Sequence, residues 1–176
     1  MRRAKIYRAI RLTTLRSGHR EHFRVVHYSI QGNHVHLICE ATDQRGLSRG
    51  VQGFASAMAR RLNRIAGVRG AFFDDRYHVR VLESPTQMRN ALSYVLNNWR
   101  RHRIDHPGWR YDPFSSGELF EGFWPGGKPP ARPPPWLDDG EPMPIASPRS
   151  WLLRIGWLKA GAISPFEVPV PDRAAA

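Results

Sequence analysis

The positions of the prolines limit where a compact fold can form in this chain. Fourteen of the fifteen prolines lie at or after Pro107, and they include most of the run from 128 to 135. Proline lacks a backbone N–H and fixes its φ angle, so such a stretch favours extended polyproline conformation and is excluded from a central strand or helix. We therefore expect one compact domain over residues 1–108 and a proline-rich tail over 109–176.

Positive charge is concentrated in the first part of the chain. The formal net charge is +12, and residues 1–110 hold 21 Lys and Arg against 7 Asp and Glu, while residues 111–176 hold 6 against 8. An excess of this size calls for a polyanionic partner, and nucleic acid is the first candidate. The single cysteine, Cys39, excludes an intrachain disulfide, and no apolar stretch approaches the roughly 20 residues that cross a bilayer. These features predict a cytoplasmic protein without membrane contact.

The tail contains one segment with the composition of a short helix. Near residues 150–159, two tryptophans lie among aliphatic and polar side chains, which indicates an amphipathic helix that docks on the domain. Because the tail has neither a positive excess nor a candidate catalytic group, we expect residues from about 111 onward to be dispensable for chemistry.

Hydrophobic periodicity predicts the elements of the domain. The expected order is a basic helix over 4–17, strands over 23–30 and 34–40, a helix over 46–66, a strand over 77–82 and a helix over 85–103. The last helix is the best marked, because Ser84 and Gln87 form a capping box around Pro85. This order favours an α+β fold, a ferredoxin-like antiparallel sheet with helices packed on one face.

Two histidines separated by one residue stand in the second expected strand. Side chains alternate along a strand, so His34 and His36 project from the same side and form a two-ligand metal platform. In a chain with eight histidines such a pair also arises by chance, and histidines on a solvent-exposed strand are the alternative interpretation.

The helix that begins at Pro85 carries a tyrosine outside its apolar stripe. Tyr94 lies nearly opposite the apolar side chains, on a polar face that we expect to aim outward. Asn98 is one turn further on and offers an amide oxygen to a hard cation beside the tyrosine. A core tyrosine would lie on the apolar face, so simple packing does not explain this position; an ordinary surface tyrosine is the alternative interpretation.

Several stretches of the domain resemble the REP-associated tyrosine transposases of the HUH single-strand DNA transposase superfamily. Residues 31–41 (QGNHVHLICEA) look like the HUH motif, and residues 75–80 (DRYHVR) and 94–98 (YVLNN) follow in the family's order and spacing. The resemblance spans about residues 5–105, and the combination is far more specific than either motif alone.

The resemblance implies a transposase or endonuclease that cleaves and rejoins single-stranded hairpin DNA. In that family the paired histidines hold a divalent metal, so His34 and His36 are the expected ligands of Mg²⁺ or Mn²⁺, with Asn98 as the third. Tyr94 is the expected nucleophile, and its attack leaves a 5′-phosphotyrosine and a free 3′-hydroxyl. No cofactor beyond metal is expected. A homodimer is possible, with Tyr94 acting on its own subunit's metal site or on the partner's.

The resemblance also has a departure. The family begins with a strand before its first helix, whereas this chain opens almost directly into the helix, so we expect the N-terminal strand to be missing and the sheet to be weakened. His78, Asp74 and Asp75 lie near the second motif, but we favour solvated hairpin and turn roles for them.

Two other functions fit part of the pattern. A non-cleaving DNA-hairpin-binding protein derived from such a transposase would keep the basic fold, and covalent attachment to DNA would tell the two apart. A metal hydrolase acting on a small phosphoester would use His34 and His36 and leave Tyr94 incidental. The charge of residues 1–110 disfavours this hydrolase, and competition by single-stranded oligonucleotides would test it.

Overall fold

A two-stranded antiparallel hairpin forms the centre of the molecule. The computed structural model describes residues 1–73, 77–102, 108–123 and 144–169. Strand β1 (Phe23–Ile30) pairs with β2 (Val35–Ala41), as the sequence predicts, and a bulge lies between Val25 and His27. The bulge shifts the alternation of side chains by one residue, so Val25 before it and Tyr28 after it both enter the first core, whereas Val26 enters the second. The hairpin and its helices confirm the α+β class.

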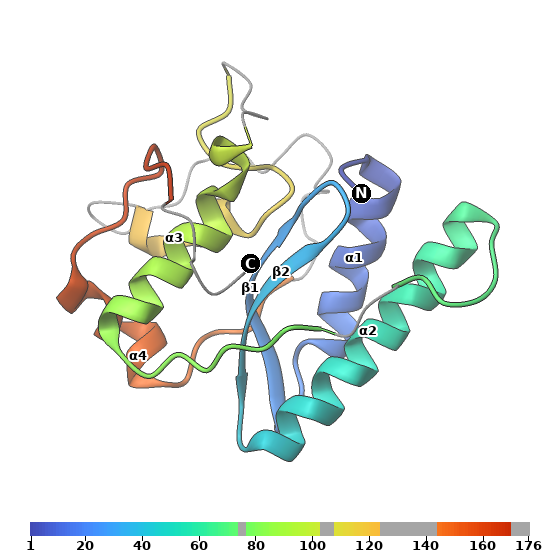
Figure 1. Cartoon of the computed structure of the whole chain (residues 1–176), viewed down its shortest axis with the longest axis horizontal. Coiled ribbons are helices and arrows are strands. Elements are labelled where there is room, and N and C mark those ends of the chain that lie inside the picture. Colours follow the sequence, from blue (N-terminus) through green and yellow to red (C-terminus); the bar gives the residue numbers. More distant parts are fainter. Residues whose placement is uncertain (74–76, 103–107, 124–143, 170–176) are drawn as a thin grey trace.

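Helices α1 (Ala4–Ser17) and α2 (Gln44–Ala66) cover one face of the hairpin (Figure 1). Asp43 caps α2 by accepting a hydrogen bond from the Gly46 N–H, and the helix ends at Gly67 in the left-handed conformation, with a φ of 69°. At Gly50, a Cβ atom would lie 2.1 Å from Cγ of Phe23, so only glycine allows this close approach to the strand. The first core fills the space between these helices and β1.

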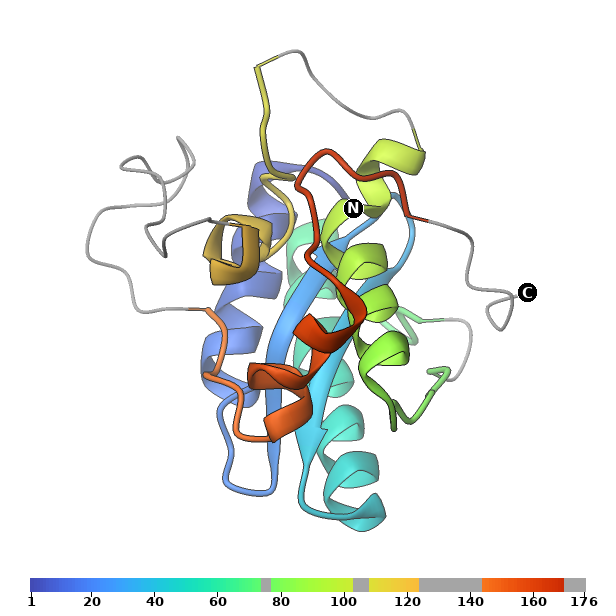
Figure 2. The ribbon, with the colours of Figure 1, turned by 90° about the vertical axis from the view of Figure 1, so that its left-hand side faces the viewer.

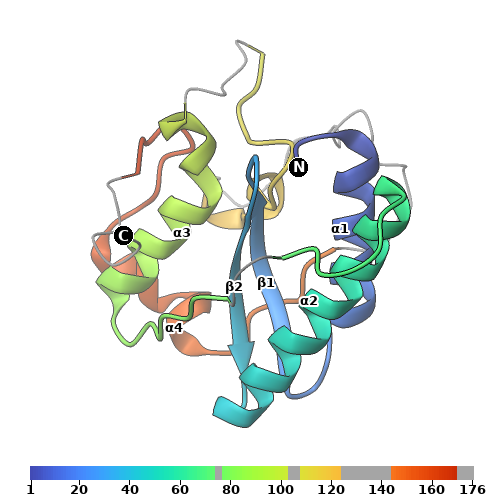
Figure 3. The ribbon, with the colours of Figure 1, turned by 45° about the vertical axis from the view of Figure 1, so that its right-hand side comes forward.

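Helix α3 (Pro85–Arg101) lies on the opposite face of the hairpin (Figure 3). Its N-terminus has the predicted capping, because the Ser84 hydroxyl accepts a hydrogen bond from the Gln87 N–H and the Gln87 side chain accepts one from the Glu83 N–H. The helices therefore cover both faces of the hairpin rather than the one face expected from the sequence. The physical reason is that the hairpin has apolar side chains on both faces, with Val26 and Ile38 pointing away from the first core toward α3.

The strand predicted over 77–82 is wrong, since this segment forms no ladder with β1 or β2 in the described part of the chain. Val79 and Val81 are 51% and 68% exposed, and of its aliphatic side chains Leu82 alone packs against the second core, so no neighbouring surface selects a strand. The outer edge of β1 is occupied by other segments: the Ser116 N–H donates to Tyr28 O, and the Ala146 N–H donates to Val25 O.

Segments after residue 108 complete the second core. Short helices η1 (Gly117–Leu119) and η2 (Glu121–Phe123) follow the strand edge, and α4 (Trp151–Arg154) and η3 (Gly156–Ala160) pack beside α3 (Figure 2). Leu153 and Trp157 are buried there, as expected of a helix that docks back. The second core thus extends past the boundary expected near residue 108. The proline run at 128–135 lies outside the described residues.

None of the helices in the described ranges is long and apolar enough to span a membrane.

Candidate active site

The start of β2 brings two imidazole rings together. His34 precedes the strand and His36 lies opposite Ser29, and their Nε2 atoms are 2.9 Å apart. The side chain of Asn33 orients the first ring, because its Oδ1 lies 2.8 Å from His34 Nδ1. The two histidines therefore project from the same side of the strand, as the alternation of side chains predicts.

Helix α3 supplies the other two predicted side chains to the same place. The Nδ2 atom of Asn98 lies 3.3 Å from His36 Nε2, and the rings of Tyr94 and His36 meet edge to face with centroids 5.1 Å apart. The structure thus brings together all four residues singled out from the sequence. The expectation that this face of α3 aims outward is wrong, because Asn98 is fully buried against the hairpin and Tyr94 is half-buried.

Both histidines are held in the neutral form. Burial, together with the nearby charges of His34 and His102, lowers the pKa of His36 to about 4. Burial also lowers the pKa of His34, and His102 adds to the effect. A neutral imidazole keeps a lone pair available to a metal, whereas a protonated one does not. Near pH 7 the pair is therefore in the protonation state that binds a cation.

The separation and chemistry of these groups fit a divalent metal. In an octahedral shell with bonds of about 2.1 Å, neighbouring ligands are roughly 3 Å apart, which matches the distance between the two Nε2 atoms. The Oδ1 atom of Asn98 is buried and has no hydrogen-bond partner in the described part of the chain. A half turn of the amide would direct this oxygen toward His36. Among the residues described, no cluster of three His, Cys, Asp or Glu forms a metal site, and the amide of Asn98 is the candidate for a third protein ligand beside the two histidines.

One contributor to the site was missed in the sequence. His102 caps the C-terminus of α3 and lies two turns beyond Tyr94, at the spacing that places side chains on one helix face. Its charge contributes to the lowered pKa values of His34 and His36. The spacing of four between Tyr94, Asn98 and His102 was the signal that could have identified it.

The other candidates from the sequence lie elsewhere. His78 is exposed in the segment that leads to α3, which agrees with the solvated role favoured for it. Asp74 and Asp75 lie outside the described residues. Tyr77 is exposed, and its hydroxyl lies 3.4 Å from Ser48 Oγ at the start of α2.

A segment of the tail lies along α3 next to the site. We call residues 162–167 the strap. Arg89 binds the Glu167 carboxylate with both terminal nitrogens, at 2.6 and 2.5 Å, and the Ser93 hydroxyl donates to the same carboxylate. One turn further on, Asn97 Nδ2 donates to Ser164 O at 2.9 Å. Polar side chains on α3 next to Tyr94 are thus engaged by the tail, a contact that local sequence patterns do not reveal.

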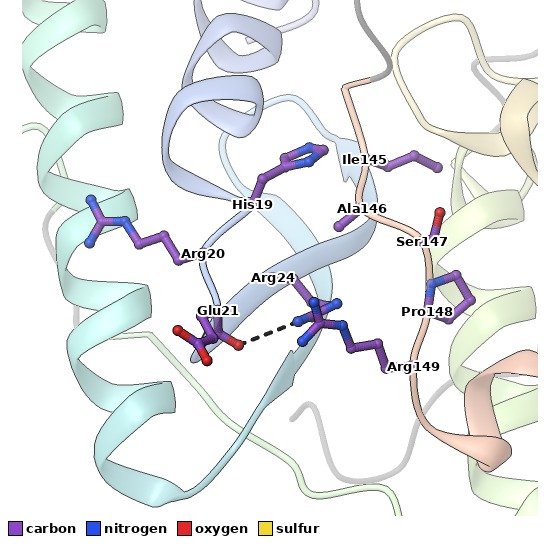
Figure 4. A pocket seen from close by; sticks show the side chains of 9 residues that line it. All are labelled: His19, Arg20, Glu21, Arg24, Ile145, Ala146, Ser147, Pro148 and Arg149. Atoms are coloured by element: carbon purple, nitrogen blue, oxygen red, sulfur yellow. Dashed lines mark hydrogen bonds between the residues drawn. The ribbon is translucent and has the colours of Figure 1, made fainter.

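One cavity of the molecule is remote from these residues. It has a volume of about 570 Å³ and lies between the start of β1 and residues 145–149 (Figure 4). Arg24 and Arg149 line it, and Glu40 lies 3.9 Å from the Arg24 guanidinium and accepts a hydrogen bond from the Arg149 backbone N–H. The cavity contains none of the four residues that meet between β2 and α3, so it is separate from the candidate active site.

The chain belongs to the family of IS200-like transposases. The family model matches residues 4–98, which span both histidines, the tyrosine and the asparagine of the site. Comparisons with curated proteins and with solved structures found no significant match. Membership of this family places the chain among proteins that bind DNA and function in DNA transposition.

Proposed function

We propose that this protein cleaves and rejoins single-stranded hairpin DNA through a 5′-phosphotyrosine intermediate, as a metal-dependent tyrosine transposase. The observation that carries the proposal is the meeting of His34, His36, Tyr94 and Asn98 between β2 and α3. A nucleophile beside a pair of neutral imidazoles is the arrangement that metal-assisted phosphodiester cleavage requires. The REP-associated branch of the family, suggested by the sequence motifs, is part of this proposal.

In the cleavage step, Tyr94 Oη attacks the scissile phosphorus. The O–P bond to tyrosine forms while the bond to the 3′ oxygen breaks; the tyrosine loses its proton, and the departing 3′ oxygen gains one. His34, His36 and Asn98 would hold Mg²⁺ or Mn²⁺, which when bound polarises the phosphate and stabilises its developing charge. The edge-to-face contact with His36 fixes the position of the Tyr94 ring beside this point. Rejoining runs the same step in reverse from a free 3′-hydroxyl.

Replacement of the proposed nucleophile tests the reaction directly. Tyr94→Phe keeps the ring and its packing but removes the attacking oxygen, so hairpin binding should persist and the covalent adduct should vanish. The measurement is denaturing electrophoresis after incubation with an end-labelled hairpin and Mn²⁺. Tyr77→Phe is the matched control and should form the adduct normally. An adduct that survives in Tyr94→Phe moves the nucleophile elsewhere, and binding without any adduct in the parent protein favours the non-cleaving function.

Replacement of either histidine tests the metal site. His34→Ala and His36→Ala should each abolish cleavage while hairpin affinity changes little, because binding rests mainly on arginines that contact phosphates. Titration of Mn²⁺ by calorimetry should show loss of the strongest site in both variants, with His78→Ala as control. Cleavage at the parent rate by both variants would refute the assignment.

A further inference from the structure

Two polar side chains at the end of β1 are fully buried on the face of the hairpin that meets α3. Beyond the bulge, Tyr28 and Ile30 point into the first core. Side chains alternate along a strand, so Ser29 and Gln31 point to the opposite face. Ser29 is 0% exposed and Gln31 is 2% exposed. Buried polar atoms need hydrogen bonds to replace their contacts with water, so each polar atom of this pair should have a partner.

Ser29 and Gln31 lie on the same face as the paired histidines. Ser29 is opposite His36 in the hairpin ladder, and the backbone N–H of Gln31 donates to the carbonyl oxygen of His34 at 2.9 Å. Residues that face one another across antiparallel strands project their side chains from the same side of the sheet. Ser29 and Gln31 are therefore the cross-strand neighbours of the two expected metal ligands.

The side-chain amide of Gln31 has one end without a partner. Its Nε2 donates to Ser29 Oγ at 2.7 Å, which holds the amide beside the residue opposite His36. Its Oε1 is buried and has no hydrogen-bond partner in the described part of the chain. A half turn of the amide would pair Oε1 with the Ser29 hydroxyl and leave Nε2 unpaired instead. Ser29 can therefore satisfy only one end of this amide.

A second amide with an unpaired oxygen contacts the same histidine. The Oδ1 atom of Asn98 is also buried and lacks a hydrogen-bond partner among the described residues, and Asn98 Nδ2 lies 3.3 Å from His36 Nε2. An amide oxygen without a donor is costly in a folded protein, yet it is a good ligand for a hard divalent cation. The two amides and the two neutral imidazoles thus offer four lone-pair donors around one place.

We propose that Gln31 is a further ligand of the divalent cation, through Oε1. This assignment deepens the proposed function, because it adds a residue to the metal site of His34, His36 and Asn98. It also gives that site a preference among metals. Two imidazoles and one further protein ligand are a donor set that zinc accepts with four-coordinate geometry. Mg²⁺ and Mn²⁺ take six ligands and favour oxygen donors, so the Gln31 oxygen selects these ions over Zn²⁺.

The test measures metal binding in the absence of DNA, by calorimetric titration with MnCl₂ and with ZnCl₂. Gln31→Met keeps the length of the side chain and removes the amide, whereas Gln31→Glu keeps an oxygen in the same place. Asn63→Leu is the matched control. The Oδ1 atom of Asn63 is likewise buried without a hydrogen-bond partner in the described ranges, but it belongs to α2, across the hairpin from α3 (Figure 1).

The variants should differ in metal preference and not only in affinity. In Gln31→Met, the affinity for Mn²⁺ should fall about tenfold, while the affinity for Zn²⁺ should fall less than about threefold. Gln31→Glu should bind Mn²⁺ at least as tightly as the parent protein, because a carboxylate oxygen replaces the amide oxygen. Asn63→Leu should leave both affinities unchanged.

Three results would overturn the assignment. Equal Mn²⁺ affinity in Gln31→Met and the parent protein would mean that Oε1 is not a ligand. Equal losses for Mn²⁺ and Zn²⁺, without recovery in Gln31→Glu, would mean that Gln31 acts through packing of the hairpin. Unchanged Mn²⁺ affinity together with weaker binding of a DNA hairpin in both variants would mean that the free end of the amide is Nε2 and that it donates to a phosphate.

Thermal melting gives an independent readout if Gln31→Met folds poorly. A buried carboxylate is costly without a counter-charge, so Gln31→Glu should melt below the parent protein in the presence of EDTA. MnCl₂ should then raise its melting temperature by more than it raises that of the parent. A rise no larger than that of the parent would contradict the assignment.

The histidine variants separate this inference from the proposed function. If Mn²⁺ affinity survives in both His34→Ala and His36→Ala, the metal site itself is wrong. If it is lost in those variants but retained in Gln31→Met, the metal site stands and the role of Gln31 alone is wrong.

Discussion

The two hydrophobic cores on either side of the hairpin are assembled from the chain in different ways. The first takes all of its buried side chains from residues 7–62, where α1, the hairpin and α2 follow one another. The second combines Val26 and Ile38 of the hairpin with α3 and with three separate parts of the chain after residue 110. The helix that carries Tyr94 therefore rests on a core that depends on distant segments, whereas the paired histidines belong to the hairpin that both cores share.

Removal of the tail should have the largest effect on this arrangement. Truncation after Arg110 deletes five buried side chains of the second core: Phe120, Phe123, Leu153, Trp157 and Ile163. At about 2 kcal/mol each, the loss is roughly 10 kcal/mol, comparable to the whole stability of a typical domain. The truncated protein should lose its cooperative thermal transition and its near-ultraviolet circular dichroism. A truncated chain that melts cooperatively and still cleaves DNA would contradict this prediction. It would instead support the expectation from the sequence that residues from about 111 onward are dispensable.

A single substitution can separate the contribution of the tail from the effect of shortening the chain. Trp157 is 3% exposed within the second core, while Trp151, on the same segment, is 50% exposed. Trp157→Ala should lower the free energy of unfolding by about 3–5 kcal/mol, because it leaves a large cavity. Trp151→Ala should lower it by less than about 1 kcal/mol. Urea unfolding of the two variants measures both values, and equal losses would mean that the segment does not dock as described.

The same contrast explains what the sequence could predict. Apolar residues that recur every two positions, or every three to four, report on neighbours along the chain, and these patterns located the hairpin, α2 and α3. In the same way, the spacing of His34 and His36 placed both rings on one side of the strand. Patterns of this kind carry no information about which distant segment fills a surface. The composition of the segment around Trp157 predicted that it docks, but not that it docks beside α3, and the occupation of the β1 edge by Ser116 left no sign in the sequence.

The prediction of a third strand was wrong for a related reason, because a strand needs a partner strand. Residues 77–82 have the composition of a strand, yet composition alone does not supply an edge to pair with, and in the described chain the outer edge of β1 is already bonded elsewhere. The prediction that Asn98 points outward was wrong for a similar reason. Helical phase shows which residues share a face, but not which surface that face meets. The four site residues were identified because their chemistry, unlike their burial, is visible in the sequence.

The smallest expected effect separates the adjacent Asn97 and Asn98 of α3, which contact the tail and the hairpin respectively. Asn98 points its amide at His36 on the hairpin, whereas Asn97 donates to Ser164 O of the strap at 2.9 Å. Asn98→Ala should raise the Mn²⁺ concentration needed for half-maximal cleavage about tenfold, as loss of a supporting ligand does, with less effect than loss of either histidine. Asn97→Ala should leave this concentration unchanged and lower the free energy of unfolding by about 1 kcal/mol, because one hydrogen bond to the strap is lost. Cleavage titrated with Mn²⁺ and urea unfolding of both variants provide the two measurements. If Asn97→Ala shifts the metal dependence more than Asn98→Ala does, the strap rather than the hairpin lies beside the metal, and the assignment of Asn98 as a ligand is wrong.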